Sequence, residues 1–194
     1  IIEEELKERG IVLPEKEVPI TKRVIHTSAD FSYAETMTYS PGAIEQALEL
    51  IKGGAHIVTD TNMAKAGINK KTLARFGGQV HCFMADETVA KLAAERKTTR
   101  AAVSMEMAAK IDKPVIFAVG NAPTALISLY ELMQKSDWRP AFIIGVPVGF
   151  VNVEAAKELI LKTDVPHIVN RGRKGGSNVA AAIVNALLYQ IRPV

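Results

Sequence analysis

From Gly54 onward, short runs rich in β-branched residues alternate with longer amphipathic stretches, and this alternation constrains the fold more than any other feature of the chain. Strands and helices that alternate in this way form βαβ units, whose right-handed crossovers build a parallel sheet. Five such runs predict an α/β fold, namely a flavodoxin-like, doubly wound parallel sheet of about five strands with helices on both faces. A Rossmann-like strand order is the alternative. The predicted strands are 55–60, 79–83, 114–120, 141–147 and 167–170.

The predicted helices lie before, between and after these strands. The clearest start signal is Ser40-Pro41, because a serine can cap a helix and a proline suits its first turn, and Gly53 would end that helix. We expect residues 1–194 to form a single domain in which the N-terminal helical segment, about 1–52, packs on the α/β core or on another subunit. The predicted helices are about 19–27, 41–52, 70–76, 86–96, 99–111, 124–134, 153–161 and 178–190.

Composition narrows the class of protein. With 194 residues, 48% hydrophobic and only 6% aromatic, the chain has enough aliphatic material for one core. A net charge of +3 with no basic run argues against nucleic acid, and the single cysteine, Cys82, argues against disulfides and thiolate metal sites. The sequence contains no evident signal peptide or membrane span, so we expect a cytoplasmic protein. Because no methionine precedes Ile1, we also expect that a few native residues are missing there.

Ligands of open parallel sheets bind beyond the carboxyl ends of the strands. The segments that follow the predicted strands, 60–67, 120–125, 145–150 and 170–178, are rich in Gly, Pro, Asn and Thr. We expect them to form one site at one edge of the sheet; ordinary turn chemistry is the alternative.

The segment "NRGRKGGSN" carries the strongest signal. Arg171, Arg173 and Lys174 follow a strand, and two glycines lead into a helix that Ser177 or Asn178 would cap. Glycines let backbone N–H groups approach a ligand, and the start of a helix carries partial positive charge, so the segment indicates an anion site. It lacks the P-loop spacing, and no G-x-G-x-x-G follows the first strand, which argues against a dinucleotide. A solvated basic turn is the alternative.

Two other helix starts carry polar candidates. Arg100 falls in the first turn of a helix after a threonine cap, where a cation opposes the helix dipole and an anionic ligand would account for it. Asn121 and Thr124 lie at a strand-to-helix turn and could offer hydrogen bonds to a ligand.

The histidines divide into two kinds. His56, His81 and His167 fall within apolar strand runs, which is typical of core or edge residues, and no pair has the spacing of a zinc site. His26 lies outside the strands, in "RVIHTSADF", among arginine, hydroxyl and aspartate side chains, a setting that suits general acid–base catalysis. No G-x-S-x-G elbow points to a hydrolase triad.

Taken together, these segments resemble the precorrin-8X methylmutase family, including its cobalt-precorrin-8 branch. The resemblance runs in order from about Glu3 to Gln190 and rests on the segments "RVIHTSADF", "VTDTNMAKAGI", "TTRAAVSMEMAA", "GNAPTALISLYEL", "GVPVGFVNVEAAKELI" and "NRGRKGGSNVAAAIVNALL".

The resemblance implies an isomerase of cobalamin biosynthesis. Its reaction would move a methyl group to the neighbouring ring carbon in a 1,5-sigmatropic shift, giving hydrogenobyrinate or, with cobalt in the ring, cobyrinate. It implies no cofactor and no protein metal site, since any cobalt is carried by the substrate, and a homodimer that holds a corrin-ring substrate near its interface. The family's catalytic histidine falls on His26 and its nearby substrate-holding arginine on Arg23, while a further family substrate contact precedes Ile1.

A corrin precursor with many acetate and propionate groups calls for arginines, lysines and neutral donors around a wide pocket. The broad ring suits apolar residues such as Val146, Pro147 and Phe150, and His26 would donate or hold a proton at a ring nitrogen. The predicted substrate-binding residues are Arg23, Thr27, Asp30, Thr61, Met63, Arg100, Asn121, Thr124, Arg171, Arg173, Lys174 and Ser177.

Two other functions remain open at this point. The first is a flavodoxin-like nucleotide or phosphate binder that uses "GRKGGSN" as its anion site. The second is a non-catalytic corrinoid carrier in which His26 is an axial cobalt ligand.

Overall fold

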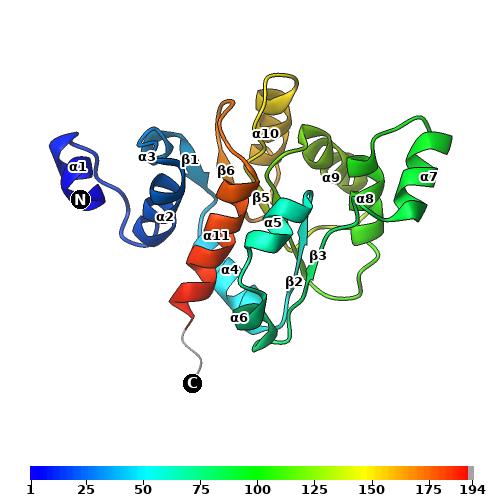
Figure 1. Cartoon of the computed structure of the whole chain (residues 1–194), viewed down its shortest axis with the longest axis horizontal. Helices are drawn as coiled ribbons and strands as arrows, with labels where there is room; N and C mark the ends of the chain where they lie inside the picture. Colours follow the sequence, from blue (N-terminus) through cyan, green and yellow to red (C-terminus); the bar gives the residue numbers. More distant parts are fainter. Residues whose placement is uncertain (192–194) are drawn as a thin grey trace.

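A six-stranded, mostly parallel sheet forms the centre of the computed structural model, which describes residues 1–191 (Figure 1). The strand order is β1-β6-β5-β4-β2-β3. Without β1, the five parallel strands follow the order 2-1-3-4-5 when renumbered along the chain, which is the flavodoxin-like order. The structure therefore confirms the predicted fold class over the Rossmann-like alternative. The strands are β1 Met37–Tyr39, β2 His56–Thr59, β3 Val80–His81, β4 Val115–Val119, β5 Phe142–Gly145 and β6 His167–Asn170.

The strand β1 was absent from the prediction, which gave about five strands. It pairs antiparallel with β6, and Met37 lies opposite Asn170 while Tyr39 lies opposite Ile168. Three residues are too few to give a periodic signal in the sequence. The strand forms because β6 would otherwise present unpaired N–H and C=O groups at the edge of the sheet.

Helices cover both faces of the sheet. All eight predicted helices are present, and all except α10 have shifted ends, whereas α1, α3 and α5 were not predicted; α5 lies in a segment expected to be a loop. The helices are α1 Ile2–Glu8, α2 Val18–Ser28, α3 Tyr33–Thr36, α4 Ala43–Lys52, α5 Asn62–Gly67, α6 Lys70–Ala74, α7 Glu87–Glu95, α8 Arg100–Ala108, α9 Pro123–Lys135, α10 Val153–Leu161 and α11 Ser177–Gln190.

Two of the predicted helix caps are wrong. Ser40 does not cap α4, which begins after Gly42 at a φ of 68°; its hydroxyl instead accepts the N–H of His167 at 2.8 Å. Ser177 and Asn178 do not cap α11, because Gly176 precedes the helix and Ser177 is its first residue.

The predicted threonine cap of α8 is confirmed. The Thr99 side chain accepts the N–H of Ala102 at 3.1 Å, so the first turn of the helix that carries Arg100 is satisfied from within the chain.

The core consists of two aliphatic layers, one on each side of the sheet. In β4, Ile116 and Ala118 face the layer that includes α2, α4 and α11, while Phe117 and Val119 face the layer that includes α8, α9 and α10. Side chains of a strand alternate between faces, and both faces are buried here, which explains why the strand is apolar throughout.

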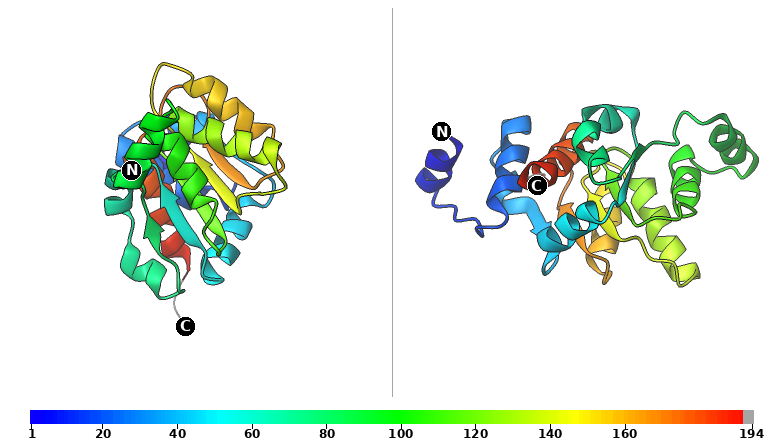
Figure 2. Two further views of the ribbon diagram at one scale, coloured as in Figure 1. Left: turned by 90° about the vertical axis from the view of Figure 1, so that its right-hand side faces the viewer. Right: turned by 90° about the horizontal axis from the view of Figure 1, so that it is seen from below.

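The N-terminal segment wraps one side of this core. The helix α2 packs against α11, and α1 lies beyond α2 at one end of the molecule, opposite α7 (Figures 1 and 2). Within the described residues, none of the helices has the length and apolar character needed to cross a bilayer.

Candidate functional site

The carboxyl ends of β2, β4, β5 and β6 meet at one edge of the sheet, and Asp60 joins two of them. This residue follows β2 directly, and its carboxylate accepts the backbone N–H groups of Gly120, Asn121 and Ala122 at 2.9, 2.8 and 2.6 Å. Asp60 is 1% exposed; burial raises its pKa, while the N–H donors act in the opposite direction. Sequence reasoning missed Asp60, although an aspartate directly after a buried strand was the available signal.

Close approach of backbones brings the remaining strand ends together. The hydroxyl groups of Thr61 and Ser177 lie 2.7 Å apart. A Cβ atom on Gly120 would lie 2.6 Å from the carbonyl oxygen of Gly176, and one on Gly175 would lie 2.0 Å from that of Val146. The Gly176 N–H already binds the Val146 carbonyl oxygen at 2.9 Å. Gly175 and Gly176 therefore allow the loop after β6 to pack closely against neighbouring backbone.

The basic loop, residues 171–176, carries three cations that each pair with a carboxylate. Lys174 Nζ lies 2.6 Å from Asp30 Oδ2 and 2.9 Å from Ser32 Oγ, and this contact lowers the pKa of Asp30 to about 2. The other two cations pair with glutamates on α10: Arg173 Nε lies 3.3 Å from Glu154 and Arg171 Nε lies 3.4 Å from Glu158. All three cations are exposed, so a ligand carboxylate could replace these partners.

A buried lysine lies beneath the basic loop. Lys157 on α10 is 0% exposed, and its Nζ donates to the carbonyl oxygens of Gly172 at 2.6 Å and Lys174 at 2.9 Å. Burial lowers its pKa to about 8. The sequence holds one signal for it, a lone lysine on the apolar face formed by Val153, Ala156 and Ile160.

His26 lies in the last turn of α2 and is exposed. Together with Ile2, Pro19, Lys22 and Arg23 it lines a shallow depression of about 330 Å³. Within residues 1–191 its ring makes no hydrogen bond, so both nitrogens face solvent or a ligand. Thr27, next to it, is also exposed.

The Arg23 side chain already makes a contact within the chain. Its guanidinium lies over the ring of Tyr189 at 4.6 Å, near the end of α11, and half of that ring is exposed. Arg23 therefore reaches across from α2 to α11.

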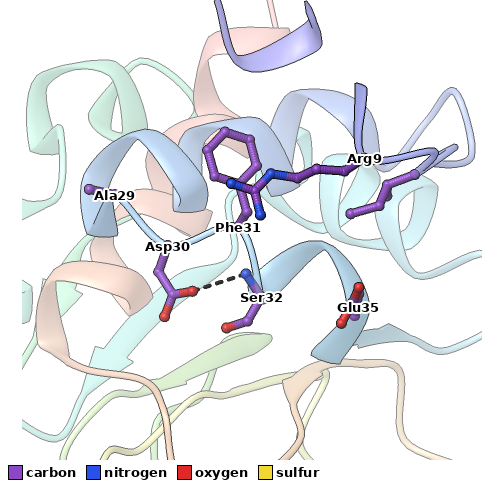
Figure 3. A pocket seen from close by; sticks show the side chains of 7 residues that line it. Arg9, Ala29, Asp30, Phe31, Ser32 and Glu35 are labelled. Carbon is purple, nitrogen blue, oxygen red and sulfur yellow. Dashed lines mark hydrogen bonds between the residues drawn. The ribbon is translucent and has the colours of Figure 1, made fainter. Parts of the chain in front are cut away.

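A second depression, of about 440 Å³, lies beside the segment that joins α2 to α3 (Figure 3). The Arg9 guanidinium covers the Phe31 ring at 4.5 Å, and Asp30 accepts the N–H of Ser32 at 2.9 Å. The carboxylate of Asp30 thus borders this depression and also binds the basic loop.

The structure brings some of the predicted residues together and separates others. Thr61 and Ser177 touch, Thr124 accepts a weak hydrogen bond from Thr99 beside Arg100, and Asp30 meets Lys174. Met63, on α5, is 72% exposed, and the side chain of Asn121 is exposed as well.

Arg171 follows the carboxyl end of β6 directly, and its side chain pairs with Glu158. It also lines a depression whose other lining residues include Ser40, Pro166 and His167, none of which is a predicted site residue. Arg23 and His26 make no direct contact with the cations of the basic loop.

The other histidines lie in strands of the sheet. His167 is buried and its Nδ1 lies 2.8 Å from the Val165 carbonyl oxygen. His56 Nδ1 and His81 Nε2 lie 2.9 Å apart on neighbouring strands, and burial lowers the pKa of both rings. In the described part of the chain, no group of three or more His, Cys, Asp or Glu residues could hold a metal ion.

The fold defines a flavodoxin-like α/β protein that presents exposed cations in the loop after β6 and an exposed histidine in the last turn of α2. The family described as precorrin-8X methylmutase matches residues 1–190. The chain belongs to this family and is therefore a methylmutase, an isomerase.

Relatives and solved structures agree with this assignment. The chain is 44% identical to the cobalt-precorrin-8 methylmutase of Salmonella typhimurium and 42% identical to that of Priestia megaterium. These matches cover 89% of this chain and 81% and 77% of the two relatives. It is also similar to the crystal structure of the precorrin-8x methyl mutase from Thermus thermophilus, with a TM-score of 0.83, 39% identity, and coverage of 91% of this chain and 85% of that one.

Proposed function

We propose that this chain moves a methyl group between neighbouring ring carbons of a corrin precursor of the precorrin-8X type. The names of the two curated relatives favour cobalt-precorrin-8 as the substrate. The rearrangement is internal to the substrate, so all of its atoms reappear in the product and neither an oxidant nor a reductant is consumed. The tasks left for the protein are to hold the ring, align the migrating bond and place a proton.

The observation that carries the site assignment is the contact between Lys174 and Asp30. It ties the basic loop to the residue that follows the last turn of α2, the turn that carries His26. This contact supports a site that includes both the imidazole of His26 and the basic loop. A ring with carboxylate arms matches this arrangement, because its arms can reach the cations while its centre lies over the imidazole.

His26 acts as the general acid in this proposal. An exposed ring that makes no hydrogen bond within residues 1–191 can hold a proton against a ring nitrogen of the substrate and so favour the reactive tautomer. Proton transfer of this kind contributes roughly 10² to 10⁴ in rate. Arg23 would contact a substrate carboxylate beside it, exchanging part of its contact with Tyr189.

The second subunit completes the site in this proposal. Phe150 is 84% exposed, Val151 76% and Met63 72%, and all three lie beyond the carboxyl ends of strands. Large apolar side chains exposed in this way are typical of an interface or of a ligand pocket. Sedimentation equilibrium tests this part, and a mass of one 21.0 kDa chain at micromolar concentration would contradict it.

A visible-absorption titration tests the function directly. Purified wild type and the His26→Ala variant are titrated with hydrogenobyrinic acid and with cobyrinic acid, and turnover is followed with the corresponding precursors. We expect a saturable spectral shift in wild type, altered in the variant, and conversion only by wild type. Binding without conversion would favour the corrinoid carrier, and protection by nucleotides without any corrinoid shift would favour the nucleotide binder.

The nucleotide alternative has less support than the methylmutase. Its predicted anion site needs free backbone N–H groups in "GRKGGSN", yet Gly176 N–H binds Val146 and the glycines pack against neighbouring backbones.

A further inference from the structure

Lys157 is the one lysine buried completely in the described part of the chain, and a buried ammonium is costly. Moving an ion from water into the protein interior costs several kcal/mol even after relaxation. No carboxylate lies in direct contact with its Nζ within residues 1–191; Glu154, about one turn earlier on α10, is the charge that acts on it. The ammonium is held by two main-chain carbonyl oxygens, and both belong to the basic loop.

The same face of α10 holds the basic loop at three points. Glu154 pairs with Arg173 and Glu158 pairs with Arg171, both at the exposed surface. Lys157 lies between them in sequence and reaches under the loop to its main chain. Residues three and four apart share one face of a helix, so a single face of α10 contacts both the side chains and the backbone of the loop.

A second buried group reinforces the backbone contact. Asn170 Nδ2 donates to the same Lys174 carbonyl oxygen at 2.9 Å, and Thr36 in turn donates to Asn170 Oδ1 at 2.6 Å. The Lys174 carbonyl therefore keeps one donor if Lys157 is removed, whereas that of Gly172 loses the donor that Lys157 supplies.

We propose that Lys157 is a positioning residue that fixes the main chain of the basic loop so that its cations are preset for the carboxylates of the substrate. This inference rests on the proposed function, because it takes the loop cations as substrate contacts. It assigns no direct contact between Lys157 and the substrate. Burial lowers the pKa of Lys157, which agrees with an ammonium that is shielded from water beneath the loop and does not reach the surface.

Fixing the loop in advance lowers the entropy cost of binding, and that gain is lost when the anchor is lost. For Lys157→Met, which keeps the length and fills the space, we expect hydrogenobyrinic acid to bind about tenfold more weakly. The KM should rise by a similar factor while kcat stays within about threefold, because contacts to remote carboxylates are made equally in the ground and transition states. Lys157→Arg keeps the donors and should recover part of the affinity.

A double-mutant cycle separates positioning from a general loss of stability. The background variant carries Arg171→Ala, Arg173→Ala and Lys174→Ala together. If Lys157 acts through these cations, Lys157→Met should weaken binding in wild type but have almost no further effect in the background variant. An equal loss in both proteins, or no loss in wild type, would overturn the proposal. Lys162→Met, at the exposed end of α10, is the matched control and should leave affinity unchanged.

Hydrogen exchange of the free protein gives a readout that does not depend on the substrate. The N–H groups of Gly149 and Gly176 bind the carbonyls of Arg173 and Val146, so both report on the shape of the loop. Faster exchange at these two amides in Lys157→Met, with unchanged exchange in β4, is the expected result. Unchanged exchange at both amides would overturn the anchoring role even if corrinoids bind.

The outcomes also distinguish the anchoring role of Lys157 from the proposed methylmutase function. If wild type binds no corrinoid while exchange is faster in the variant, the proposed substrate is wrong and the loop anchor stands. If Lys157→Met does not fold, Lys157→Gln takes its place, since its shorter, neutral side chain removes the ammonium while it remains polar.

Discussion

The basic loop and the last turn of α2 both carry predicted site residues, yet the protein holds them in opposite ways. The loop and its neighbours are anchored by buried polar groups, with Asp60, Lys157 and Asn170 each bonded to backbone. His26 and Thr27 are exposed and make no such contact among the described residues. The difference indicates that the edge of the sheet is preorganised before a ligand arrives, whereas the last turn of α2 has no comparable buried anchor for His26 among the described residues.

The comparison predicts that substitutions on α2 affect turnover, whereas those at the edge of the sheet affect stability. His26→Ala should lower kcat by roughly 10² to 10⁴, because it removes the proposed general acid. The free energy of unfolding, measured with urea, should change by less than about 0.5 kcal/mol, since the side chain is exposed. Normal turnover by this variant would remove His26 from the mechanism.

The opposite result is expected for Asp60→Ala. Three backbone N–H groups lose their acceptor, one of them buried and two partly buried, so the free energy of unfolding should fall by about 2–4 kcal/mol. Urea denaturation measures this loss, and Asp137→Ala, at an exposed position, is the matched control. A loss no larger than that of the control would mean that the edge is not held by Asp60.

Gly120→Ala tests the close approach of the loops. The added Cβ would lie 2.6 Å from the Gly176 carbonyl and 2.8 Å from the Ser177 Cα, so backbone must shift. Overpacking of this kind costs about 1–3 kcal/mol. In Gly145→Ala the new Cβ meets side-chain atoms at 3.3 Å or more, so a smaller loss is expected in thermal unfolding. If both variants lost the same free energy of unfolding, the close approach of Gly120 to the start of α11 would not explain the loss.

The smallest expected effect concerns the ion pair between Asp30 and Lys174, which links the segment after α2 to the basic loop. The pKa of Asp30 falls from 3.8 to about 2 in the folded protein because Lys174 and Ser32 donate to its carboxylate. A lowered folded-state pKa stabilises the fold above about pH 4, and this contribution is lost as the pH falls toward 2. Lys174 is 58% exposed, so the contribution is under about 1 kcal/mol.

Unfolding of wild type and Asp30→Asn between pH 5 and pH 2.5 measures this contribution. The two curves should differ most at pH 5 and converge at the acid end. Parallel curves would show that the ion pair adds nothing to stability.

Much of the fold and part of the site could be read from the sequence, for identifiable reasons. The strands β2, β4, β5 and β6 are buried on both faces and therefore apolar without interruption, which is a local signal. The three loop cations were visible because they follow a strand directly. The strand β1 left no signal, since it is three residues long and exists through its pairing with β6.

The partners of the buried charges could not be assigned by pattern, because they are distant in the sequence. Asp60 and Gly120 are 60 positions apart, and Lys157 donates to carbonyl oxygens 15 and 17 positions away. The cap predicted at Ser40 failed for the same reason, since its hydroxyl bonds to His167 across the sheet edge.

The sequence by itself determined the class of fold, the two-faced core and the side chains available for chemistry, because hydrophobic period and residue type are properties of single segments. Only the tertiary structure decided which of these side chains are anchored and which are free. That outcome depends on which backbone groups the folded chain brings within hydrogen-bond distance. The packing of α2 and α10 leaves His26 exposed and buries Lys157.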